Sequence, residues 1–417
     1  MIKIYLSYKK QLNNFIYLSI VYGINILLPL ILFPFLLSSL GKEIYGEVIY
    51  AQTIASYFLV FTNFGFNISS TKAISLHREN KERVNLIFSS TIYSKLLFFF
   101  LSLFILVLFG TFFNLKGDKL LLYALSLLIC FSDALLPIWY FQAIEKMKYI
   151  TVANLLSRLS GAICILIFVR DKSDYLLVPC LYFLGNFLGA IISLYIVFIK
   201  EKVCLTPLLI SEIFKRVKEG YLFLFSDFSA ILKDKGNITI IGAFLGMSYV
   251  VYYDLAEKIV WAFRSILYNL NIAFFPYIVK IKNRIITKKI IWFAFICSLI
   301  CYSLLCVFSN EIIYLLSRNT EMFFINSFIY IQGIYLLLAT LSSCVGQFIM
   351  ITHNLERYFF KSLLISSLSY FLFVFLLYIF NFFSIESLVL IYNGSIFVEL
   401  IYRLYICRRK KLIQWVF

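Results

Sequence analysis

Long apolar runs fill almost the whole chain, and the polar connections between them are short. We count twelve runs, at residues 12–38, 45–68, 86–112, 119–141, 150–169, 174–198, 220–246, 250–277, 289–309, 325–350, 360–381 and 383–406. An α-helix needs about 20 apolar residues to cross the hydrocarbon of a bilayer, and these runs have that length. Lipid offers no partner to a free backbone N–H or C=O, so only helices or closed barrels can cross it. Helix-length runs exclude a barrel, whose strands alternate over about ten residues. The pattern therefore predicts an all-α integral membrane protein with about twelve transmembrane helices.

The composition agrees with this class. Of the 417 residues, 62% are hydrophobic and 14% are charged, whereas soluble proteins have about 25% charged residues. The net charge of +17 could suggest nucleic acid, but the charges lie at the ends of apolar runs, where they set membrane orientation. We therefore expect membrane lipids, and no nucleic acid, as partners.

The cysteines and histidines give no sign of a metal or redox cofactor. Nine Cys are scattered, mostly within apolar runs, without a C-x-x-C pair, and the only histidines are His77 and His353. Zinc and thiol-redox sites need closely spaced ligands of these types. We expect no cofactor and no metal.

Lys and Arg are concentrated in alternate loops. One side of the membrane holds the N-terminus, loops 69–85, 142–149, 199–219, 278–288 and 351–359, and the C-terminal tail. With the charges just inside adjacent helix ends, this side has about 26 Lys and Arg. The other side has six, namely Lys42, Lys116, Lys119, Arg170, Lys172 and Arg318. By the positive-inside rule, both termini are predicted to be cytoplasmic, which requires an even number of spans.

The longest polar connection, residues 199–219, lies at the middle of the chain. Its segment 207–219 is basic and amphipathic, which is typical of a helix on the membrane surface. This linker divides the chain into an N-terminal six-helix bundle, residues 1–206, and a C-terminal six-helix bundle, residues 207–417.

A weak internal repeat supports this division. Leu40-Gly41 precedes Ala51 by the same spacing as Leu245-Gly246 precedes Ala256, an offset close to half the chain length. Six helices in each half would make this a parallel repeat about an axis along the membrane normal.

Ionisable residues also lie inside the predicted spans. They are Lys95, Arg158, Lys233, Lys235, Lys258, Arg264, Asp133, Asp227, Asp234, Asp254, Glu257 and Glu399. A charge at the centre of a transmembrane helix costs at least about 2.5–3.5 kcal/mol, so such residues mark functional sites or pairs. Lys95, Asp227 and Glu399 lie nearer to span ends, and we expect them to reach the interface.

The span at 250–277 has a polar stripe. Asp254, Glu257, Trp261, Arg264, Tyr268 and Asn271 recur at spacings of three or four residues and share one helix face. Such a face must meet protein or water. A hairpin turn near 247–249 would join this span to the preceding one. Four residues of the preceding span would then lie at a similar depth in the membrane, namely Lys233, Asp234, Lys235 and Asn237. The pattern predicts a water-filled cavity in which Asp234 and Arg264 can meet, with a purely structural ion pair as the alternative.

A second pair is expected in the first half, because Asp133 and Arg158 each lie nine residues from loop 142–149. Its role, structural or functional, stays open. Prolines at 29, 34, 137 and 276 are expected to bend or break spans. Gly185-x-x-x-Gly189 and Gly242-x-x-x-Gly246 are helix-packing motifs.

No motif for chemistry on a soluble substrate occurs. The chain has no P-loop and no G-x-S-x-G, and its polar loops are too short for a large extramembrane domain. Transport, or an enzyme acting on lipid within the membrane, remains.

Five segments resemble the bacterial O-antigen flippases of the multidrug/oligosaccharidyl-lipid/polysaccharide exporter superfamily. They are LSSLGKEIYGEVIYAQT at 37–53, FGFNISSTKAIS at 64–75, WYFQAIEKMKYIT at 139–151, YYDLAEKI at 252–259 and AFFPYI at 273–278. The first motif, with Gly41, Gly46 and Ala51, and the W-x-F-Q-x-x-E-x-M block are fairly specific together. Ala143 departs from the pattern, because relatives commonly have Gly there. The last three spans match by hydropathy alone.

The resemblance implies two six-helix bundles around a central cavity in the bacterial inner membrane. It also implies translocation of an undecaprenyl-diphosphate-linked oligosaccharide, the O-antigen repeat unit, and therefore a transporter and not an enzyme. Cationic side chains would bind the diphosphate. The candidate cargo-binding residues are Arg264, Lys233, Lys235, Lys258 and Arg158, with Trp261 and Tyr268 stacking on sugars. Asp234, Glu257, Asp254 and Asp133 would carry a coupling ion, proton or sodium, or form structural pairs.

Three alternatives remain. A passive structural protein would not retain this many charges within its spans. A drug/cation antiporter of the same superfamily should have a cavity dominated by acidic residues, whereas the charges here have both signs. A membrane-embedded polysaccharide polymerase, an enzyme, usually needs a large periplasmic loop, whereas the longest polar loop here is predicted to be cytoplasmic.

Overall fold

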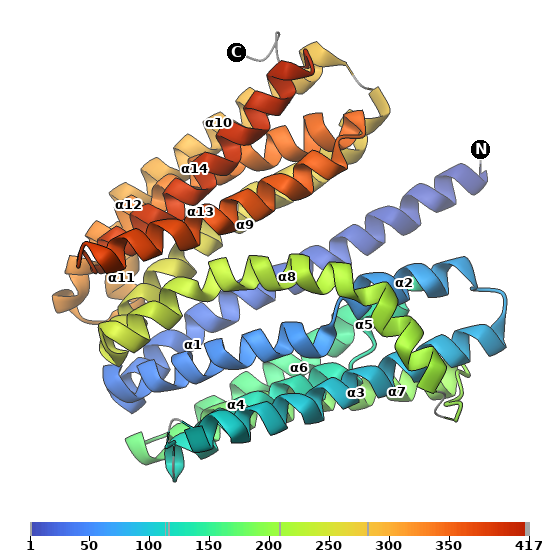
Figure 1. The fold of residues 1–417 in the computed structure, drawn as a ribbon, viewed down its shortest axis with the longest axis horizontal. Coiled ribbons are helices and arrows are strands. Elements are labelled where there is room, and N and C mark those ends of the chain that lie inside the picture. Colours follow the sequence, from blue (N-terminus) through green and yellow to red (C-terminus); the bar gives the residue numbers. More distant parts are fainter. Residues whose placement is uncertain (1, 113, 116, 208–209, 282, 413–417) are drawn as a thin grey trace. The chain divides into compact units, whose positions relative to one another are not determined.

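A computed structural model describes the backbone of residues 2–112, 114–115, 117–207, 210–281 and 283–412 (Figure 1). Side chains are described in these ranges except at residues 2–22, 273, 276, 280, 281 and 321. Of the residues singled out in the sequence, Lys116 and positions 208–209 of the predicted linker lie outside the described residues, as do the side chains of Ala273 and Pro276.

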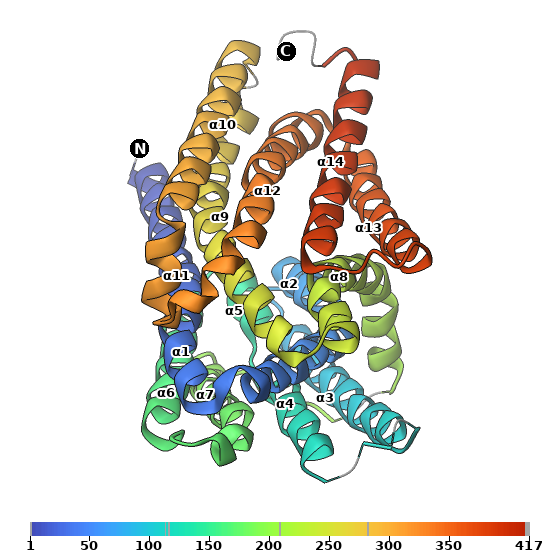
Figure 2. The same cartoon turned by 90° about the vertical axis from the view of Figure 1, so that its left-hand side faces the viewer.

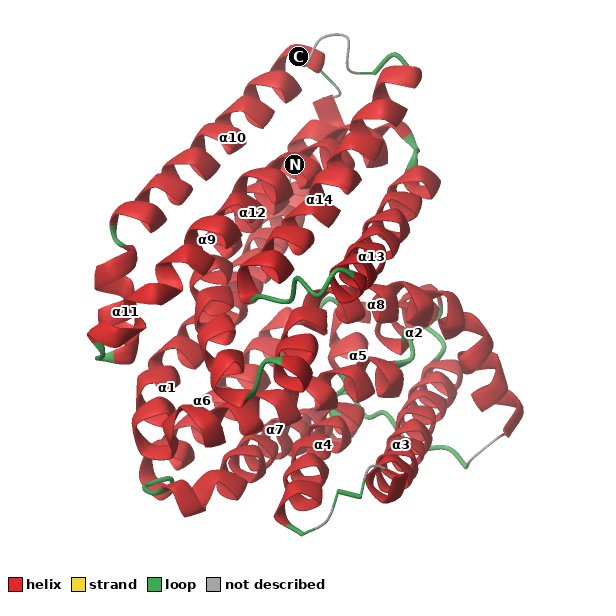
Figure 3. Ribbon diagram, turned by 60° about the vertical axis from the view of Figure 1, so that its left-hand side comes forward, coloured by secondary structure: helices red, strands yellow, loops and turns green. Residues whose placement is uncertain are grey.

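Helices and turns make up the described ranges, which contain no β-strand (Figure 3). Within them, nine helical stretches are long and apolar enough to cross a membrane. The mid-span charges of the predicted spans 220–246 and 250–277 fall in two further helices, α8 (Ile210–Phe244) and α9 (Met247–Ile281). The prediction of an all-α, multi-span membrane protein is confirmed, and the count of twelve spans stays a prediction.

The chain divides into two compact units, residues 1–231 and 232–417, with the division inside α8. The helices of the first unit, besides the first half of α8, are α1 (Ile2–Asn63), α2 (Phe66–Leu76), α3 (Lys81–Phe112), α4 (Asp118–Leu135), α5 (Ile138–Ala143), α6 (Met147–Phe168), the 3-10 turn η1 (Lys172–Leu176), α7 (Leu177–Tyr195) and the π turn η2 (Ile196–Lys200). Helix α7 packs along α6 and α4, and α1 contacts α3, α4 and α6. Pro137 lies in the break between α4 and α5, as expected from its missing N–H.

The second unit is built around α12. Besides the second half of α8 and α9, its helices are α10 (Arg284–Val307), α11 (Ser309–Ser317), the 3-10 turn η3 (Thr320–Ile325), α12 (Asn326–Cys344), the π turn η4 (Val345–Met350), the 3-10 turn η5 (Ile351–His353), α13 (Glu356–Ile379) and α14 (Ile385–Arg409). Helix α12 packs against α9, α10 and α14, and α13 packs on α14 (Figure 2). The polar stripe of α9 therefore has protein on its α12 side.

The two glycines of the internal repeat have the same role. Gly41 interrupts α1 with φ 75°, and Gly246 joins α8 to α9 with φ 112°. Only glycine adopts such angles without strain. The hairpin turn is thus at Leu245-Gly246, two residues before the predicted position. Gly246 acts in this turn rather than in helix packing, because a Cβ there would meet nothing within 4 Å.

The predicted linker is fastened to the first unit. The backbone N–H groups of Cys204 and Thr206 donate to Asn85 Oδ1 and Ser89 Oγ of α3, at 3.1 Å and 2.8 Å. From Ile210 onward the segment forms the first turns of α8. Arg216, which lies in this predicted cytoplasmic loop, is 1% exposed and pairs with Glu219 at 2.8 Å. The position of this segment on the membrane surface stays a prediction, as does the division into two six-helix bundles.

Gly185 of the G-x-x-x-G motif on α7 lies in close contact with α6. A Cβ at Gly185 would lie 2.5 Å from the Ser157 carbonyl oxygen and 2.8 Å from the Gly161 nitrogen. We expect Gly185→Leu to force α6 and α7 apart, at about 1–3 kcal/mol or more, and to lower membrane protein abundance and detergent thermal stability. Gly23→Leu is the matched control, because nothing lies within 4 Å of its Cβ. Equal stability of the two variants would contradict this packing.

The orientation of the chain can be tested with truncation fusions to a two-sided reporter. We expect a fusion after Lys116 to report the periplasm and one after Lys202 to report the cytoplasm, because Lys and Arg are concentrated in alternate loops. A third fusion, after Lys411, should agree with the second. The same side for the first two would refute the predicted alternation of loops.

Candidate functional site

The second unit contains a cluster of charged side chains that are buried or half-buried. Five of its side chains are basic and four are acidic: Lys233, Lys235, Lys258, Arg264, Arg403, Asp234, Asp254, Glu257 and Glu399. They come from α8, α9 and α14, and α12 and α13 supply hydroxyl and carbonyl partners. Burying charges is costly unless they are paired, so their partners decide which groups are structural and which can bind a ligand.

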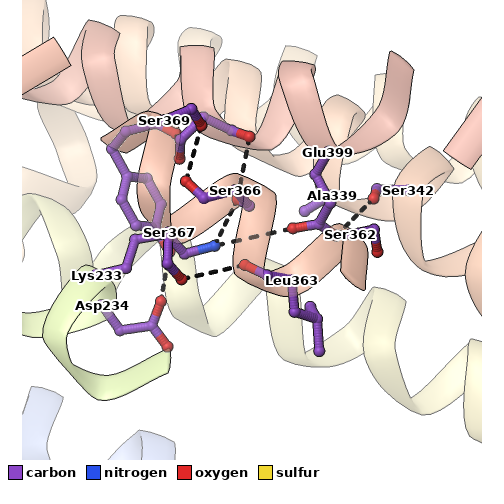
Figure 4. Close-up of polar contacts among 12 residues, drawn as sticks. Lys233, Asp234, Ala339, Ser342, Ser362, Leu363, Ser366, Ser367, Ser369 and Glu399 are labelled. Carbon is purple, nitrogen blue, oxygen red and sulfur yellow. Dashed lines mark hydrogen bonds and ion pairs between the residues drawn. The ribbon is translucent and has the colours of Figure 1, made fainter. Parts of the chain in front are cut away.

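Glu399 lies at the centre of one network in the cluster. It pairs with Arg403 at 2.8 Å and with Lys233 at 3.9 Å, and it accepts a hydrogen bond from Ser342 at 2.9 Å. The Lys233 ammonium also donates to Ser366 Oγ at 3.0 Å, and Figure 4 shows it between Ser366 and Glu399. These contacts join α8, α12, α13 and α14.

Arg403 has several hydrogen-bond partners besides Glu399. It donates to the Ser342 carbonyl at 2.6 Å, to Ser342 Oγ at 3.0 Å and to Ser362 Oγ at 2.9 Å, and its guanidinium lies 4.6 Å from the Phe359 ring centroid. Its side chain is 3% exposed. With all of its partners in place, Arg403 is a structural group.

The sequence prediction for this network was wrong. Glu399 was expected to reach the interface, but it is buried, as is Arg403, which the sequence did not single out. The spacing of four residues between them on one helix is a signal that could have revealed the pair. Asp227, which like Glu399 and Lys95 was expected to reach the interface, is exposed.

Two further pairs lie along α9. Lys235 of α8 contacts both carboxylate oxygens of Glu257 at 3.3 Å, and Asp254 pairs with Lys258 one turn away. The predicted meeting of Asp234 with Arg264 does not occur. Because the hairpin turn lies two residues earlier than predicted, the facing positions shift, and Lys235–Glu257 is the ion pair that joins the two helices.

Arg264 differs from the other cations. Among the described residues, no carboxylate lies within 4.0 Å of its guanidinium. Its hydrogen bonds are long, 3.5 Å to Thr340 Oγ1 and 3.4 Å to the Ala339 carbonyl, and its Cζ lies 5.6 Å from the Tyr335 ring centroid. Arg264 is nevertheless only 8% exposed. A buried guanidinium with weak neutral partners is suited to an anionic ligand.

Asp234 is the acidic counterpart of Arg264. It accepts a hydrogen bond from the Tyr392 hydroxyl at 3.1 Å, and among the described residues no cation lies within ion-pair distance of it. Asn237, one turn further on α8, is fully buried and satisfied by Tyr253, Tyr370 and the Leu388 carbonyl. The two hydrogen-bonding environments differ: Asn237 is fixed, whereas Asp234 can accept another partner.

The predicted stripe on α9 does not lie in one environment. Asp254, Glu257, Arg264 and Asn271 are buried, whereas Trp261 and Tyr268 are 41% and 39% exposed. Asn271 donates to Ser343 of α12 at 2.6 Å. The α12 side of the stripe is thus packed in protein, and the two aromatic side chains are accessible.

The first unit contains a separate polar site. Lys95, expected to reach the interface, is 1% exposed, pairs with Asp133 at 3.5 Å and donates to Asn67 Oδ1 at 3.2 Å. Lys95 of the neighbouring helix α3 is thus the residue within ion-pair distance of Asp133, and Arg158 interacts with Asp133 only over a longer distance. Arg158 is partly buried, and its Nε has no hydrogen-bond partner among the described residues.

The fold and this arrangement define a class of protein. In the described ranges no cluster of three or more His, Cys, Asp or Glu could hold a metal. The structure is similar to that of a lipid II flippase, MurJ, in an inward closed conformation, with a TM-score of 0.74, 13% identity and coverage of 95% of this chain and 89% of that one. It is also similar to an inward-facing multidrug resistance MATE transporter, with a TM-score of 0.67, 13% identity and coverage of 92% and 97%. The chain therefore shares the fold of these two proteins.

The chain belongs to the polysaccharide biosynthesis protein family, whose model matches residues 11–282. A relative of Escherichia coli K12, described as a "putative O-antigen transporter", is 29% identical over 87% of this chain and 89% of its own length. A relative of Shigella dysenteriae with the same description is 25% identical over 87% of this chain and 92% of its own. The resemblance seen in the sequence motifs is confirmed.

Proposed function

We propose that this protein is a flippase that moves an undecaprenyl-diphosphate-linked oligosaccharide, an O-antigen repeat unit, across the bacterial inner membrane. Alternating access coupled to an ion gradient would drive the movement. The family, the transporter fold and the description of the relatives as O-antigen transporters support this proposal. The observation that carries it is Arg264, a buried cation without an acidic partner among the described residues.

Arg264 is the residue we assign to the cargo diphosphate. A planar guanidinium can donate two parallel hydrogen bonds to phosphate oxygens, and such charge-assisted bonds are about twice as strong as neutral ones. The long bonds to Thr340 and Ala339 can be exchanged at little cost. The undecaprenyl tail can stay in lipid while the polar head passes.

The other cations are assigned weaker roles than Arg264 in binding the cargo diphosphate. Lys235 and Lys258 have ion pairs in the resting structure, with Glu257 and Asp254. Lys233 has only a long pair with Glu399. We propose that Lys233, Lys235, Lys258 and, in the first unit, Arg158 add positive potential along the pathway rather than direct contacts as strong as that of Arg264.

The remaining candidate residues have supporting roles in this proposal. Trp261 and Tyr268 are accessible aromatic side chains close to Arg264 on α9, and they can stack on sugar faces. Asp234 is our first candidate for the coupling ion, because it has no cationic partner within ion-pair distance among the described residues. Glu257, Asp254 and Asp133 are already paired with Lys235, Lys258 and Lys95, and we propose mainly structural roles for them.

A drug/cation antiporter is the second candidate, because MATE transporters share the fold. An antiporter of cationic drugs needs a net negative site, whereas this cluster has five basic and four acidic side chains. A membrane-embedded polymerase is the third candidate, and the transporter fold disfavours it.

Accessibility of α9 tests the proposed hydrated pathway. In a background without native cysteines, Tyr268→Cys is expected to react with a small membrane-impermeant thiol reagent, and undecaprenyl diphosphate should slow the reaction. Ile266→Cys is a matched control, because Ile266 is 56% exposed on another face of α9. Equal labelling at both positions without protection, or no labelling at Tyr268→Cys beside a reactive loop control, would contradict the pathway.

A further inference from the structure

Two tyrosines lie between Arg264 and Asp234, the two charges of the cluster that have no ion pair among the described residues. The Arg264 guanidinium lies over the ring of Tyr335, with Cζ 5.6 Å from the ring centroid. The Tyr335 ring packs against that of Tyr392, with centroids 5.5 Å apart and an interplanar angle of 46°. The Tyr392 hydroxyl donates to Asp234 at 3.1 Å. We call Tyr335 and Tyr392 the aromatic bridge.

The aromatic bridge crosses four helices. Arg264 is on α9, Tyr335 on α12, Tyr392 on α14 and Asp234 on α8. Tyr335 and Tyr392 are 9% and 7% exposed. Since protein interiors are close-packed, a buried ring cannot shift without moving the ring in contact with it. A change at Arg264 therefore has a continuous packed route to Asp234.

Tyr392 is held by more than this one contact. Its ring lies 6.4 Å from that of Tyr370 in an edge-on arrangement, and the Lys233 ammonium lies 5.9 Å from its centroid. Contacts on several sides leave few positions for the ring. The hydrogen bond to Asp234 is the contact that a small rotation of Tyr392 would lengthen, because hydrogen bonds weaken steeply with distance and angle.

We propose, resting on the function proposed above, that the aromatic bridge couples cargo binding at Arg264 to cation binding at Asp234. A diphosphate on Arg264 competes with the cation–π contact and releases Tyr335. Tyr392 follows, and its hydroxyl withdraws from Asp234. A carboxylate that loses its hydroxyl donor gains affinity for a cation. By linkage, the cation raises the affinity for the diphosphate by the same factor.

The groups facing Asp234 bear on the choice of cation. They are Lys233 and Lys235 on α8, Glu257 on α9, and Glu399 and the Tyr392 hydroxyl on α14. Sodium and protons are therefore varied separately, because the neighbouring carboxylates can also bind either cation. Tyr335 and Tyr392 act as positioning residues, since they touch Arg264 and Asp234 and need not touch the cargo.

The experiment measures binding of undecaprenyl diphosphate to the purified full-length protein in lipid nanodiscs, at several sodium concentrations and at several pH values. In the wild type, one of the two cations should tighten binding by about 5- to 150-fold, the usual range of coupling between sites. Tyr392→Phe and Tyr335→Leu should bind at high cation concentration but show less than about twofold dependence on it. Tyr253→Phe is the matched control: it removes a buried hydroxyl bonded to neutral Asn237 and should keep the wild-type coupling.

The outcomes separate this inference from the proposed function. No binding by wild type, or binding unaffected by Arg264→Ala, contradicts the proposed function and the inference with it. Binding that depends on Arg264 but is insensitive to both cations overturns the coupling alone. So does unchanged cation dependence in Tyr392→Phe, because a purely Coulombic effect of Asp234 on the cargo would survive the loss of the hydroxyl. Loss of coupling in Tyr392→Phe with coupling retained in Tyr253→Phe supports the aromatic bridge.

Discussion

Arg264→Ala is expected to reduce glycan export by about 10- to 100-fold while the protein remains in the membrane at near wild-type abundance. A hydrogen bond to a charged group contributes about 1.5–3 kcal/mol, and about 1.4 kcal/mol corresponds to a factor of ten. Abundance should persist because the guanidinium has no ion pair among the described residues, so its removal strands no carboxylate. Surface polysaccharide per unit of membrane protein, in a strain lacking the native gene, is the measurement.

The accompanying variants separate charge from geometry. Arg264→Lys should keep partial export, because the positive charge survives and the two-pronged donor does not. Arg357→Ala, at an exposed position on α13, is the control and should export normally. A double variant with Asp234→Ala should be no better than Arg264→Ala, since the structure does not pair these residues. Full export by Arg264→Ala would remove the diphosphate assignment.

Glu399→Leu is expected to give the largest loss of stability. It leaves Arg403 and Lys233 buried without their carboxylate, and breaking a buried pair costs about 3–5 kcal/mol. We expect little protein in the membrane and a strongly lowered temperature of unfolding in detergent. Glu79→Leu, which changes an exposed carboxylate in the same way, should be near wild type in both measurements.

Stepwise removal of the stranded charges should restore the protein. Replacing a whole buried pair with apolar residues is often neutral or stabilising. Adding Arg403→Met to Glu399→Leu should recover part of the abundance, and adding Lys233→Met as well should recover most of it. If Glu399→Leu alone accumulates like the wild type, the network is not structural. If the triple variant stays absent, packing rather than charge explains the loss.

The amino-acid sequence by itself determined the class and most helix positions. Runs of about 20 apolar residues specify spans because the bilayer requires internally bonded backbone, and this requirement does not depend on tertiary packing. The gaps between apolar runs lie near Gly41 and Gly246, where the structure has its breaks, and the motif at Gly185 indicated a helix-packing position, which the structure shows to be the contact of α6 with α7. The motifs also identified the family.

Only the tertiary structure decided which charges meet. Depth along two antiparallel helices suggested Asp234–Arg264 and Asp133–Arg158, yet the observed partners are Lys235–Glu257 and Lys95–Asp133. The sequence gives the position of a residue along the helix axis. Whether two residues pair also depends on the rotation of each helix about its axis and on the position of any third helix, and packing determines both. Arg403 has its partners on α12 and α13. Arg264 differs from the other cations of the cluster because no carboxylate lies within 4.0 Å of it among the described residues. The spacing of residues in the sequence cannot predict this, because it depends on which helices pack around Arg264.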